Sequence, residues 1–339
     1  MTDGAFAFGL GVGTHNSKGH WLEVFFPQPL LHPSQALATA LQACDNNRAL
    51  SRDELAALQA ALAAAGEKAQ AQLAAQLLDS ERPVVAVFLG DDLPPGSVPE
   101  AYLKLHLLSH RLVKPHGTNL EGVFGALPNV AWTSEGAIDL EELPARQLAA
   151  RLRGDVLEVS CVDKFPKMTN YVVPGGVRIA HTARVRLGAY LGEGTTIMHE
   201  GFVNFNAGTE GPGMIEGRIS AGVMVGTGSD LGGGCSTMGT LSGGGNIIIS
   251  VGEKCLIGAN AGIGIPLGDR CTVEAGLFVT AGTKVTLLDA EGMPAETAKA
   301  RDLAGKSDLL FRRNSSTGAV ECLTNRSAVE LNQELHAHN

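Results

Sequence analysis

The sequence predicts a mixed protein built on a left-handed parallel β-helix, with an N-terminal α/β domain and a short C-terminal extension. The first observation is a repeat of apolar residues, six positions apart in each run, between Ile179 and Val285. The second is the glycine that directly follows many of these residues, as in Leu191-Gly192 and Leu231-Gly232. Each unit is therefore one short strand and one tight turn, which is typical of a hexapeptide β-helix.

The period of the repeat explains the expected shape. Three units make one coil of about eighteen residues, whose apolar side chains point inward and whose strands pair in parallel with the next coil. Glycine supplies the left-handed backbone conformation at the corners, where a bulky residue would be strained. An α-helix is excluded because its period is 3.6 residues, and a collagen-like chain is excluded because glycine does not occupy every third position.

The repeat loses its register at three places, namely 209–214, 241–246 and 263–267. Insertions in a solenoid emerge as loops on one face, and such loops often carry function. We therefore expect loops at the first two places and a smaller slip at the third.

Residues 1–165 are predicted to form a separate α/β domain. Ser51 and Glu54 have capping-box spacing and begin a helical, alanine-rich stretch. The segment 9–13 is interpreted as a plain glycine-rich turn, because no helix follows it as a phosphate-binding turn requires. Further elements are expected as strands at 21–26 and 83–89 and as helices at 51–78, 98–112 and 140–152. No chemical motif stands out, so this domain is expected to serve packing and trimer contacts.

The β-helix is expected over 166–288 and the C-terminal extension over 289–339. In the extension, a loop at 288–294, a short helix near 296–303 and a strand with a basic turn at 309–315 are predicted. The extension is too short to fold alone and is expected to pack against a β-helix.

The composition argues against several classes of protein. The 339 residues carry a net charge of -9 without a basic block, which argues against a nucleic-acid partner. The six cysteines lack CxxC spacing, no apolar run reaches the roughly 18 residues of a membrane helix, and the first residues do not resemble a secretory signal. A cytoplasmic protein with reduced, structural thiols is expected.

Four residues are candidates for a base, nucleophile or metal ligand: His181, His199, Glu200 and Glu216. His181 and His199 are eighteen residues apart, so they should stack on neighbouring coils. Proteins built on a left-handed β-helix are typically homotrimeric acyltransferases, which is an analogy of fold. Transfer of an acyl group from coenzyme A needs a group that activates the acceptor, amides near the thioester carbonyl and cations for the phosphates.

Beyond the repeat lie Lys299, Arg312 and Arg313, which suit phosphate groups as point charges and bidentate forks. A solvated tail and surface histidines remain the structural alternatives.

Several blocks of the sequence closely resemble tetrahydrodipicolinate N-succinyltransferases of the branch found in actinobacteria and pseudomonads. They cover 163–166, 198–208, 216–222, 238–245 and 311–315, within a resemblance over about 160–325, while the N-terminal domain is similar only in size and placement. The resemblance implies a homotrimer that moves succinyl from succinyl-CoA to the amine of ring-opened tetrahydrodipicolinate. The product, N-succinyl-2-amino-6-oxopimelate, leads to diaminopimelate and lysine.

The resemblance also implies roles for individual residues. Glu216 would be the catalytic carboxylate, as nucleophile or general base, and Arg218 would bind a carboxylate of succinyl or acceptor. The implied succinyl-CoA groove comprises Gly233, Ser236, Ala259, Glu274, Ala275 and Gly282, closed by Lys299, Arg312, Arg313, Asn314 and Ser315.

No cofactor beyond the co-substrate is implied. Some relatives place a divalent cation at the trimer axis with two acidic residues, one of which matches Glu200 and the other of which aligns with Ala183. Alanine has no ligand atom, so magnesium is expected to bind Glu200 weakly, through water, or not at all.

Three alternatives stay open at this point. One is a hexapeptide acyltransferase that moves acetyl to an amino sugar with His199 as base. Another is a β-helical metalloenzyme that uses His181 and His199. The third is a trimeric scaffold without catalysis.

Overall fold

The computed structural model describes residues 5–41, 45–239 and 247–324. The chain divides into two compact units. The first comprises Met1–Val113, Gly117–Pro166 and Asn170–Val172, and the second comprises Lys114–His116, Lys167–Thr169 and Val173–Asn339.

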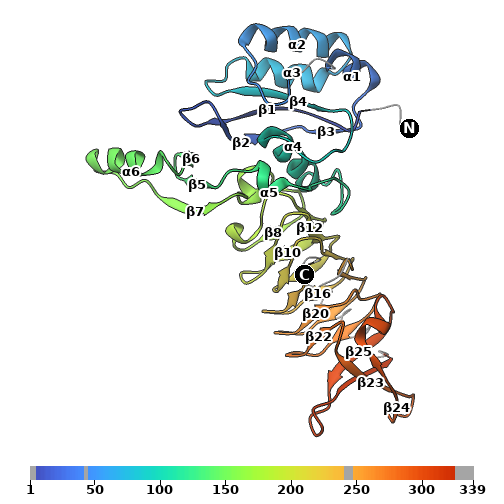
Figure 1. Ribbon diagram of the computed structural model, residues 1–339. Coiled ribbons are helices and arrows are strands. Elements are labelled where there is room, and N and C mark those ends of the chain that lie inside the picture. The colour runs from blue at the N-terminus through green and yellow to red at the C-terminus, as the bar shows by residue number, and fades with distance from the viewer. Residues whose placement is uncertain (1–4, 42–44, 240–246, 325–339) are drawn as a thin grey trace. The chain divides into compact units, whose positions relative to one another are not determined.

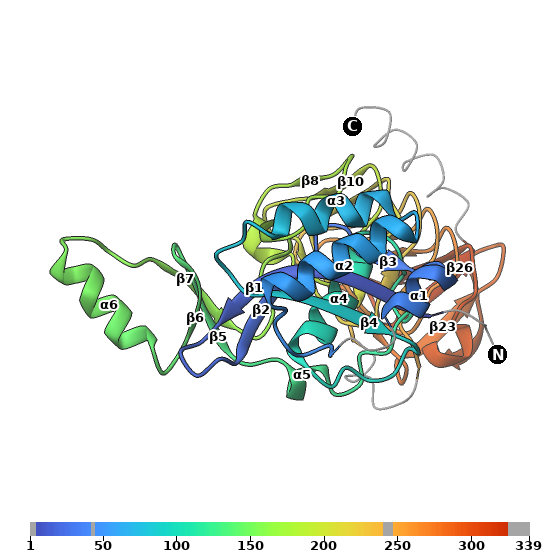
Figure 2. The same cartoon turned by 90° about the horizontal axis from the view of Figure 1, so that it is seen from above.

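The first unit contains an antiparallel sheet in which β1 pairs with each of its three neighbours. Helices α1, α2 and α3 cover one face of this sheet, and α4 lies on the other (Figures 1 and 2). The strands are β1 (Ala7–His15), β2 (Trp21–Phe25), β3 (Leu30–Leu31) and β4 (Val84–Leu89), and the helices are α1 (Gln35–Leu41), α2 (Arg52–Ala64), α3 (Lys68–Leu77) and α4 (Val98–Ser109).

The turn predicted at 9–13 is wrong, because these residues lie inside β1. A Cβ atom added to Gly9 would lie 2.7 Å from Leu103 of α4 and 2.7 Å from the ring of Phe26. The alternate side chains Phe8 and Leu10 pack into the core under α2 and α3. Glycine on one face of β1 therefore allows α4 to pack close to the sheet, which a turn motif cannot reveal.

Most other predictions for this unit are confirmed. Ser51 caps α2 in a capping box with Glu54, and strands and helices occur at the other expected places. The expected helix at 51–78 is two helices, separated at Gly66, whose φ is +81°. The unit also contains α5 (Val123–Ala126), α6 (Leu143–Leu152) and a second sheet of β5 (Val130–Thr133), β6 (Gly136–Asp139) and β7 (Val159–Asp163) in the order β6-β5-β7.

The second unit is a parallel β-helix with three sheets, as the repeat predicts (Figure 1). The first sheet contains β8 (Arg178–Ile179), β10 (Thr195–Ile197), β13 (Gly213–Ile215), β16 (Asp230–Leu231), β19 (Leu256–Ile257) and β21 (Thr272–Val273). The second contains β11 (Phe202–Val203), β14 (Arg218–Ile219), β17 (Ser236–Thr237), β20 (Gly262–Gly264) and β22 (Phe278–Thr280). The third contains β9 (Ala189–Leu191), β12 (Ala207–Thr209), β15 (Met224–Val225) and β18 (Ser250–Val251).

Apolar residues of the repeat form columns inside the β-helix. Ile197, for example, pairs in register with Ile179 on one neighbouring strand and with Ile215 on the other. From Val185 to Val285, every apolar residue of the six-residue repeat is at most 3% exposed. Stacking of the coils therefore buries the repeat, which a single coil could not do.

The loop expected at 209–214 is absent. Thr209 is an inner residue with 0% exposure, so the six-residue step continues through it from Val203 to Ile215. The register is instead lost in the next step, because Ile215 and Ile219 are both inner residues only four positions apart. The slip at 263–267 is a second step of four, and 241–246 lies outside the described residues.

The C-terminal part of the second unit differs from the expected helix at 296–303. β24 (Pro294–Lys299) pairs antiparallel with β23 (Lys284–Leu288), and only a 3₁₀ turn, Ala300–Leu303, follows it. Pairing with β23 satisfies backbone groups that a helix would have satisfied internally. The strand predicted at 309–315 is confirmed as β25 (Leu309–Arg313), which pairs with β21 and with β26 (Val320–Thr324).

Within residues 5–41, 45–239 and 247–324, no helix has the length and apolarity needed to span a membrane.

Candidate functional site

The candidate site centres on one unusually short corner of the β-helix. Corners that join the first and second sheets contain four residues in other coils, as at 198–201, 232–235 and 258–261. In the coil of β13, β14 and β15 the same corner contains only Glu216 and Gly217, which we call the short corner. The side chain of Glu216 therefore lies between two longer corners.

Close backbone packing makes the short corner possible. A Cβ atom on Gly217 would lie 2.2 Å from Sγ of Cys235 and 2.7 Å from its carbonyl oxygen, so only glycine fits without a shift. Glu216 N–H donates to the carbonyl of Leu231 at 2.8 Å, and Arg218 N–H donates to that of Cys235 at 2.9 Å. Backbone hydrogen bonds on both sides of Gly217 thus hold the short corner against the next coil.

The carboxylate of Glu216 lies close to the next corner. Its Oε2 is 3.4 Å from the place where Gly233 would carry a Cβ atom, and the residue is half-buried. Arg218 is exposed, and its guanidinium forms no ion pair with any residue that the structure describes. Arg218 pairs in register with Ser236 on the second sheet. An acid and a free cation thus lie two residues apart on one edge of the prism.

Three small residues of the predicted groove follow this edge. Gly233, Ala259 and Ala275 occupy equivalent positions in the corners of three successive coils. Asn260 N–H donates to the carbonyl of Gly233, and Gly276 N–H donates to that of Ala259, each at 2.8 Å. The structure therefore aligns these three predicted residues in one column that begins beside Glu216.

The last hairpin meets the end of this column. Arg313 N–H donates to Oε2 of Glu274 at 2.6 Å, which brings the predicted segment 312–315 to the last corner. Asn314 Oδ1 accepts hydrogen bonds from the backbone of Ser316 and Thr317 and fixes the turn. Ser315 is exposed in this turn.

Gly282 and Lys299 are placed elsewhere in the last coil. Gly282 is exposed in the turn between β22 and β23, and Lys299 ends β24, where its pairing partner is Lys284. Within one chain, the structure does not bring these two residues to the column of Gly233, Ala259 and Ala275.

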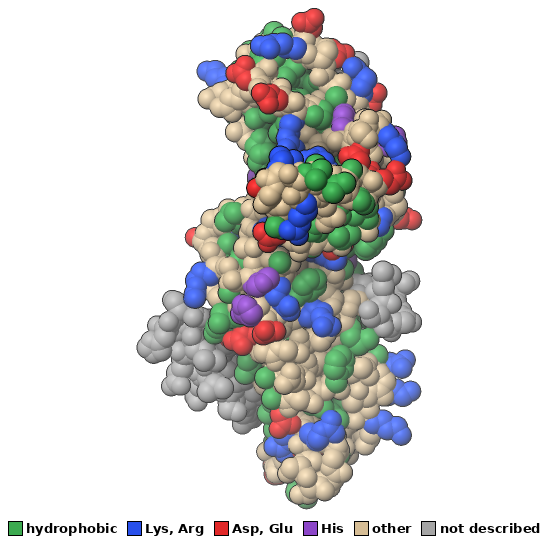
Figure 3. Space-filling view, turned by 90° about the vertical axis from the view of Figure 1, so that its left-hand side faces the viewer, with side chains coloured by type: hydrophobic (Ala, Val, Ile, Leu, Met, Phe, Trp, Pro, Cys, Tyr) green, Lys and Arg blue, Asp and Glu red, His purple; other side chains and the backbone are tan. Residues whose placement is uncertain are grey.

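The two histidines stack as their spacing predicts. The ring centroids of His181 and His199 are 5.4 Å apart with an interplanar angle of 85°. Figure 3 shows histidine side chains exposed side by side on one face of the molecule. Oε1 of Glu200 is 3.4 Å from Nδ1 of His199, and both side chains are exposed. No group of three acidic, histidine or cysteine side chains among the described residues could hold a metal ion. Ala183, which the resemblance aligns with the second acid, has no side-chain ligand atom, so of that pair only Glu200 offers an oxygen.

Sequence reasoning missed Gly217 and Cys235 as residues that shape the site. The spacing of inner residues contained the clue, since a step of four between Ile215 and Ile219 marks a corner shortened by two. The irregularity predicted at 209–214 therefore belongs to the step after Ile215.

Comparison with known proteins extends the resemblance to the whole chain. The family model described as the middle region of tetrahydrodipicolinate N-succinyltransferase matches residues 127–167, and a hexapeptide repeat of succinyltransferases matches residues 248–281. Proteins named 2,3,4,5-tetrahydropyridine-2,6-dicarboxylate N-succinyltransferase are 67% identical in Pseudomonas paraeruginosa, over 100% of both chains, and 61% identical in Vibrio cholerae, over 98% of this chain and 99% of that one.

A solved structure from Campylobacter jejuni is also similar, with a TM-score of 0.87 and 35% identity over 96% of this chain and 94% of that one. It is described as a 2,3,4,5-tetrahydropyridine-2-carboxylate N-succinyltransferase. Together with the hexapeptide repeat, this similarity supports the left-handed β-helix of an acyltransferase.

Proposed function

This chain belongs to the tetrahydropyridine dicarboxylate N-succinyltransferase family, and we propose that it transfers succinyl from succinyl-CoA to the amine of ring-opened tetrahydrodipicolinate. The observation that carries the proposal is the short corner, which presents Glu216 next to Arg218 at the head of the column of small residues. The product would be N-succinyl-2-amino-6-oxopimelate, in the cytoplasmic synthesis of diaminopimelate and lysine.

The reaction forms an amide bond and breaks a thioester bond. Water opens the ring of tetrahydrodipicolinate and yields the free amine, which attacks the succinyl carbonyl carbon. As a general base, Glu216 would take the proton that the amine loses, while the thiolate of coenzyme A leaves and is protonated. As a nucleophile, it would displace the thiolate first, and the amine would then attack the resulting anhydride.

Arg218 suits the negative charges of this reaction, because both succinyl and the acceptor carry carboxylates. Its exposed guanidinium offers a planar fork that matches a carboxylate. The column of Gly233, Ala259 and Ala275, together with Ser236 and Glu274, would line the donor groove. Arg312, Arg313, Asn314 and Ser315 would lie at its far end.

We further propose that the protein acts as a homotrimer. Gly282 and Lys299 lie outside the column within one chain, so a groove that includes all predicted residues would need a neighbouring copy. Sedimentation equilibrium should give a mass three times that of the chain. A monomer with full activity would refute this assembly.

The test of the proposed reaction is thiol release from succinyl-CoA with tetrahydrodipicolinate or 2-aminopimelate as acceptor. Wild-type protein is expected to use succinyl-CoA rather than acetyl-CoA, and Glu216→Ala is expected to lose activity by about a thousandfold or more. His199→Ala is the matched control, since the rival acetyltransferase would use that residue as base. Loss of activity in His199→Ala with little change in Glu216→Ala would refute the assignment.

A second measurement separates the two roles of Glu216. If Glu216 is the nucleophile, rapid mixing with succinyl-CoA alone should release one equivalent of coenzyme A and leave succinyl on the protein. If it is the general base, no thiol should appear until the acceptor is added.

A further inference from the structure

We infer that Cys235 is a positioning residue. Its buried thiol packs against the backbone of Gly217 and thereby sets the position of the Glu216 carboxylate. The inference rests on the proposed role of Glu216. Cys235 lies one coil away from Glu216, so it would affect the reaction only through the position of that carboxylate.

The contact between the two corners is the first support. Sγ of Cys235 lies where the side chain of residue 217 would begin, 2.2 Å from the ideal Cβ position. Cys235 is 1% exposed, so the thiol fills space inside the corner instead of reaching solvent. The backbone of Gly217 therefore rests directly on this thiol.

The backbone hydrogen bonds of Cys235 are the second support. The carbonyl of Cys235 accepts from Arg218 N–H at 2.9 Å, and its own N–H donates to the carbonyl of Gly232 at 3.0 Å. One residue thus closes its own corner and holds the end of the short corner. A smaller or larger side chain at position 235 would therefore move the backbone of Gly217, and with it the neighbouring Glu216.

The thiol itself is not suited to react. Burial, and to a smaller extent the charge of Glu216, raises the pKa of Cys235 to about 12. The thiol is therefore neutral at physiological pH, and a neutral thiol is a poor nucleophile. Its contribution is packing, which distinguishes it from a catalytic cysteine.

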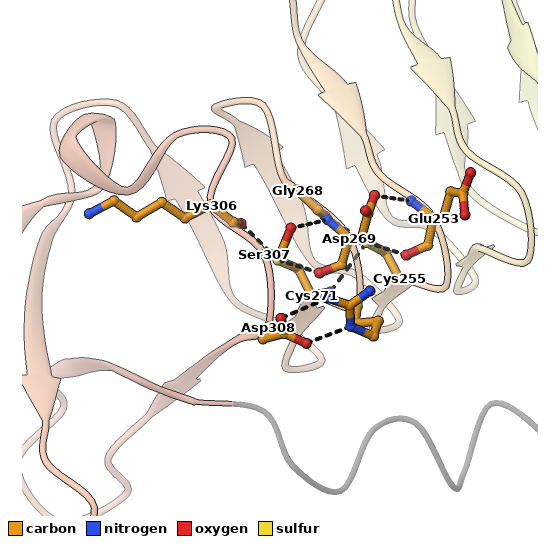
Figure 4. A network of polar contacts seen from close by, with 9 residues as sticks. Glu253, Cys255, Gly268, Asp269, Cys271, Lys306, Ser307 and Asp308 are labelled. Carbon is orange, nitrogen blue, oxygen red and sulfur yellow. Dashed lines mark hydrogen bonds and ion pairs between the residues drawn. The ribbon is translucent and has the colours of Figure 1, made fainter.

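Cys255 provides a matched control. It is also a buried thiol of the β-helix, with 0% exposure, but it belongs to a corner of the neighbouring edge. As Figure 4 shows, it lies in a network with Cys271 and Gly268, where its Sγ is 3.1 Å from the carbonyl of Gly268. Replacing it should affect stability without moving Glu216.

The experiment compares Cys235→Ala, Cys235→Ser and Cys255→Ala in the complete protein. Since small misplacements of a reacting group cost up to about a hundredfold in rate, we expect Cys235→Ala to lower kcat by about tenfold. The KM values for both substrates should change less than kcat, because the proposed groove residues Ala259 and Ala275 lie in other coils than the altered contact. Cys235→Ser should recover kcat to within about threefold of wild type, and Cys255→Ala should lower Tm but keep the wild-type kcat.

Wild-type kcat in Cys235→Ala, or an equal loss in Cys255→Ala, would overturn the inference. If Cys235→Ala does not fold, Gly217→Ala still tests the inference, since it alters the same contact from the other side and should also lower kcat. A crystal structure of the variant gives a readout that does not depend on turnover. The Glu216 carboxylate should shift by about 1 Å relative to Gly233, and an unchanged position refutes the inference even if the proposed reaction is wrong.

The two proposals can also fail separately. If Glu216→Ala keeps its activity, the proposed catalytic role is wrong. If Glu216→Ala is inactive while Cys235→Ala has wild-type kcat, only the positioning role is wrong.

Discussion

Arg312 donates through Nε to Oε2 of Glu321 across the last hairpin, at 3.0 Å. The other carboxylate oxygen of Glu321 accepts from Nδ2 of Asn314 at 2.8 Å, and the residue is only 6% exposed. These hydrogen bonds, first that from Asn314 and then that from Arg312, lower the pKa of Glu321. Two residues of the proposed donor groove are therefore held by one buried acid that sequence reasoning did not single out.

Glu321→Gln is expected to raise the KM for succinyl-CoA about fivefold with little change in kcat. Removing the charge loosens Arg312, which would contact the donor equally in ground and transition states. Steady-state kinetics with varied succinyl-CoA would show the effect. Asp308→Asn is the control, because Asp308 pairs with Arg270 away from the column. An unchanged KM in Glu321→Gln, together with a raised KM in Arg312→Ala, would contradict this role.

Two glycine substitutions in the β-helix should differ in their effect on stability. A Cβ atom on Gly208 would lie 2.0 Å from the backbone carbonyl oxygen of Tyr190, whereas one on Gly262 would lie 2.1 Å from the ring of Phe278. That ring is 45% exposed and can move, but the backbone of Tyr190 cannot. We expect Gly208→Ala to cost about 3 kcal/mol and Gly262→Ala about 1 kcal/mol of unfolding free energy.

Thermal or denaturant unfolding of both variants would check this difference. Gly262→Ala with Phe278→Ala should recover part of the loss, because the second change removes the ring. Equal destabilisation by the two glycine substitutions would show that Phe278 is as rigid as backbone.

His106 should make the first unit sensitive to acid. The ring is fully buried, with Nδ1 donating to the carbonyl of Tyr102 at 2.7 Å and Nε2 accepting from Phe26 N–H at 3.2 Å. Burial lowers its pKa to about 3. Because the folded pKa lies below the unfolded value of about 6.5, stability is fully present above that value and is lost as the pH falls from about 6.5 toward 3.

Urea unfolding at pH 7 and pH 5, followed by tryptophan fluorescence, measures this loss, since both tryptophans, Trp21 and Trp132, belong to the first unit. One proton taken up on unfolding lowers the unfolding free energy by about 1.4 kcal/mol per pH unit. His106→Gln should be less stable at pH 7 but should lose less between pH 7 and pH 5. A variant with the wild-type pH dependence would mean that other groups, such as His15 and His110, account for it.

Removal of divalent cations is expected to leave activity and Tm unchanged. Ala183 has no side-chain ligand atom, and Glu200 has an exposed carboxylate 3.4 Å from Nδ1 of His199. Dialysis against EDTA followed by the thiol-release assay is the test, with added Mg²⁺ as the comparison. Activity that falls with EDTA and returns with Mg²⁺ would contradict it.

The β-helix could be predicted from the sequence because its physical cause is local. A period of six with glycine at the turns allows one way of burying the apolar residues, and each coil repeats the arrangement of the last. The stacking of His181 on His199 followed from the same count, since a separation of one coil places two residues side by side. Glu216 and Arg218 were proposed from short blocks of sequence, and their roles stay predictions.

The sequence by itself thus determined the solenoid, its inner residues and the family to which the chain is similar. Only the tertiary structure decided how the short corner is built, which residue supports Gly217, that 9–13 is a strand beneath α4, and that 294–299 pairs with β23. Each of these features depends on contacts between residues far apart in the chain, such as Gly217 with Cys235 and Gly9 with Leu103. Local propensity does not predict such contacts, because they are formed only when distant segments pack together.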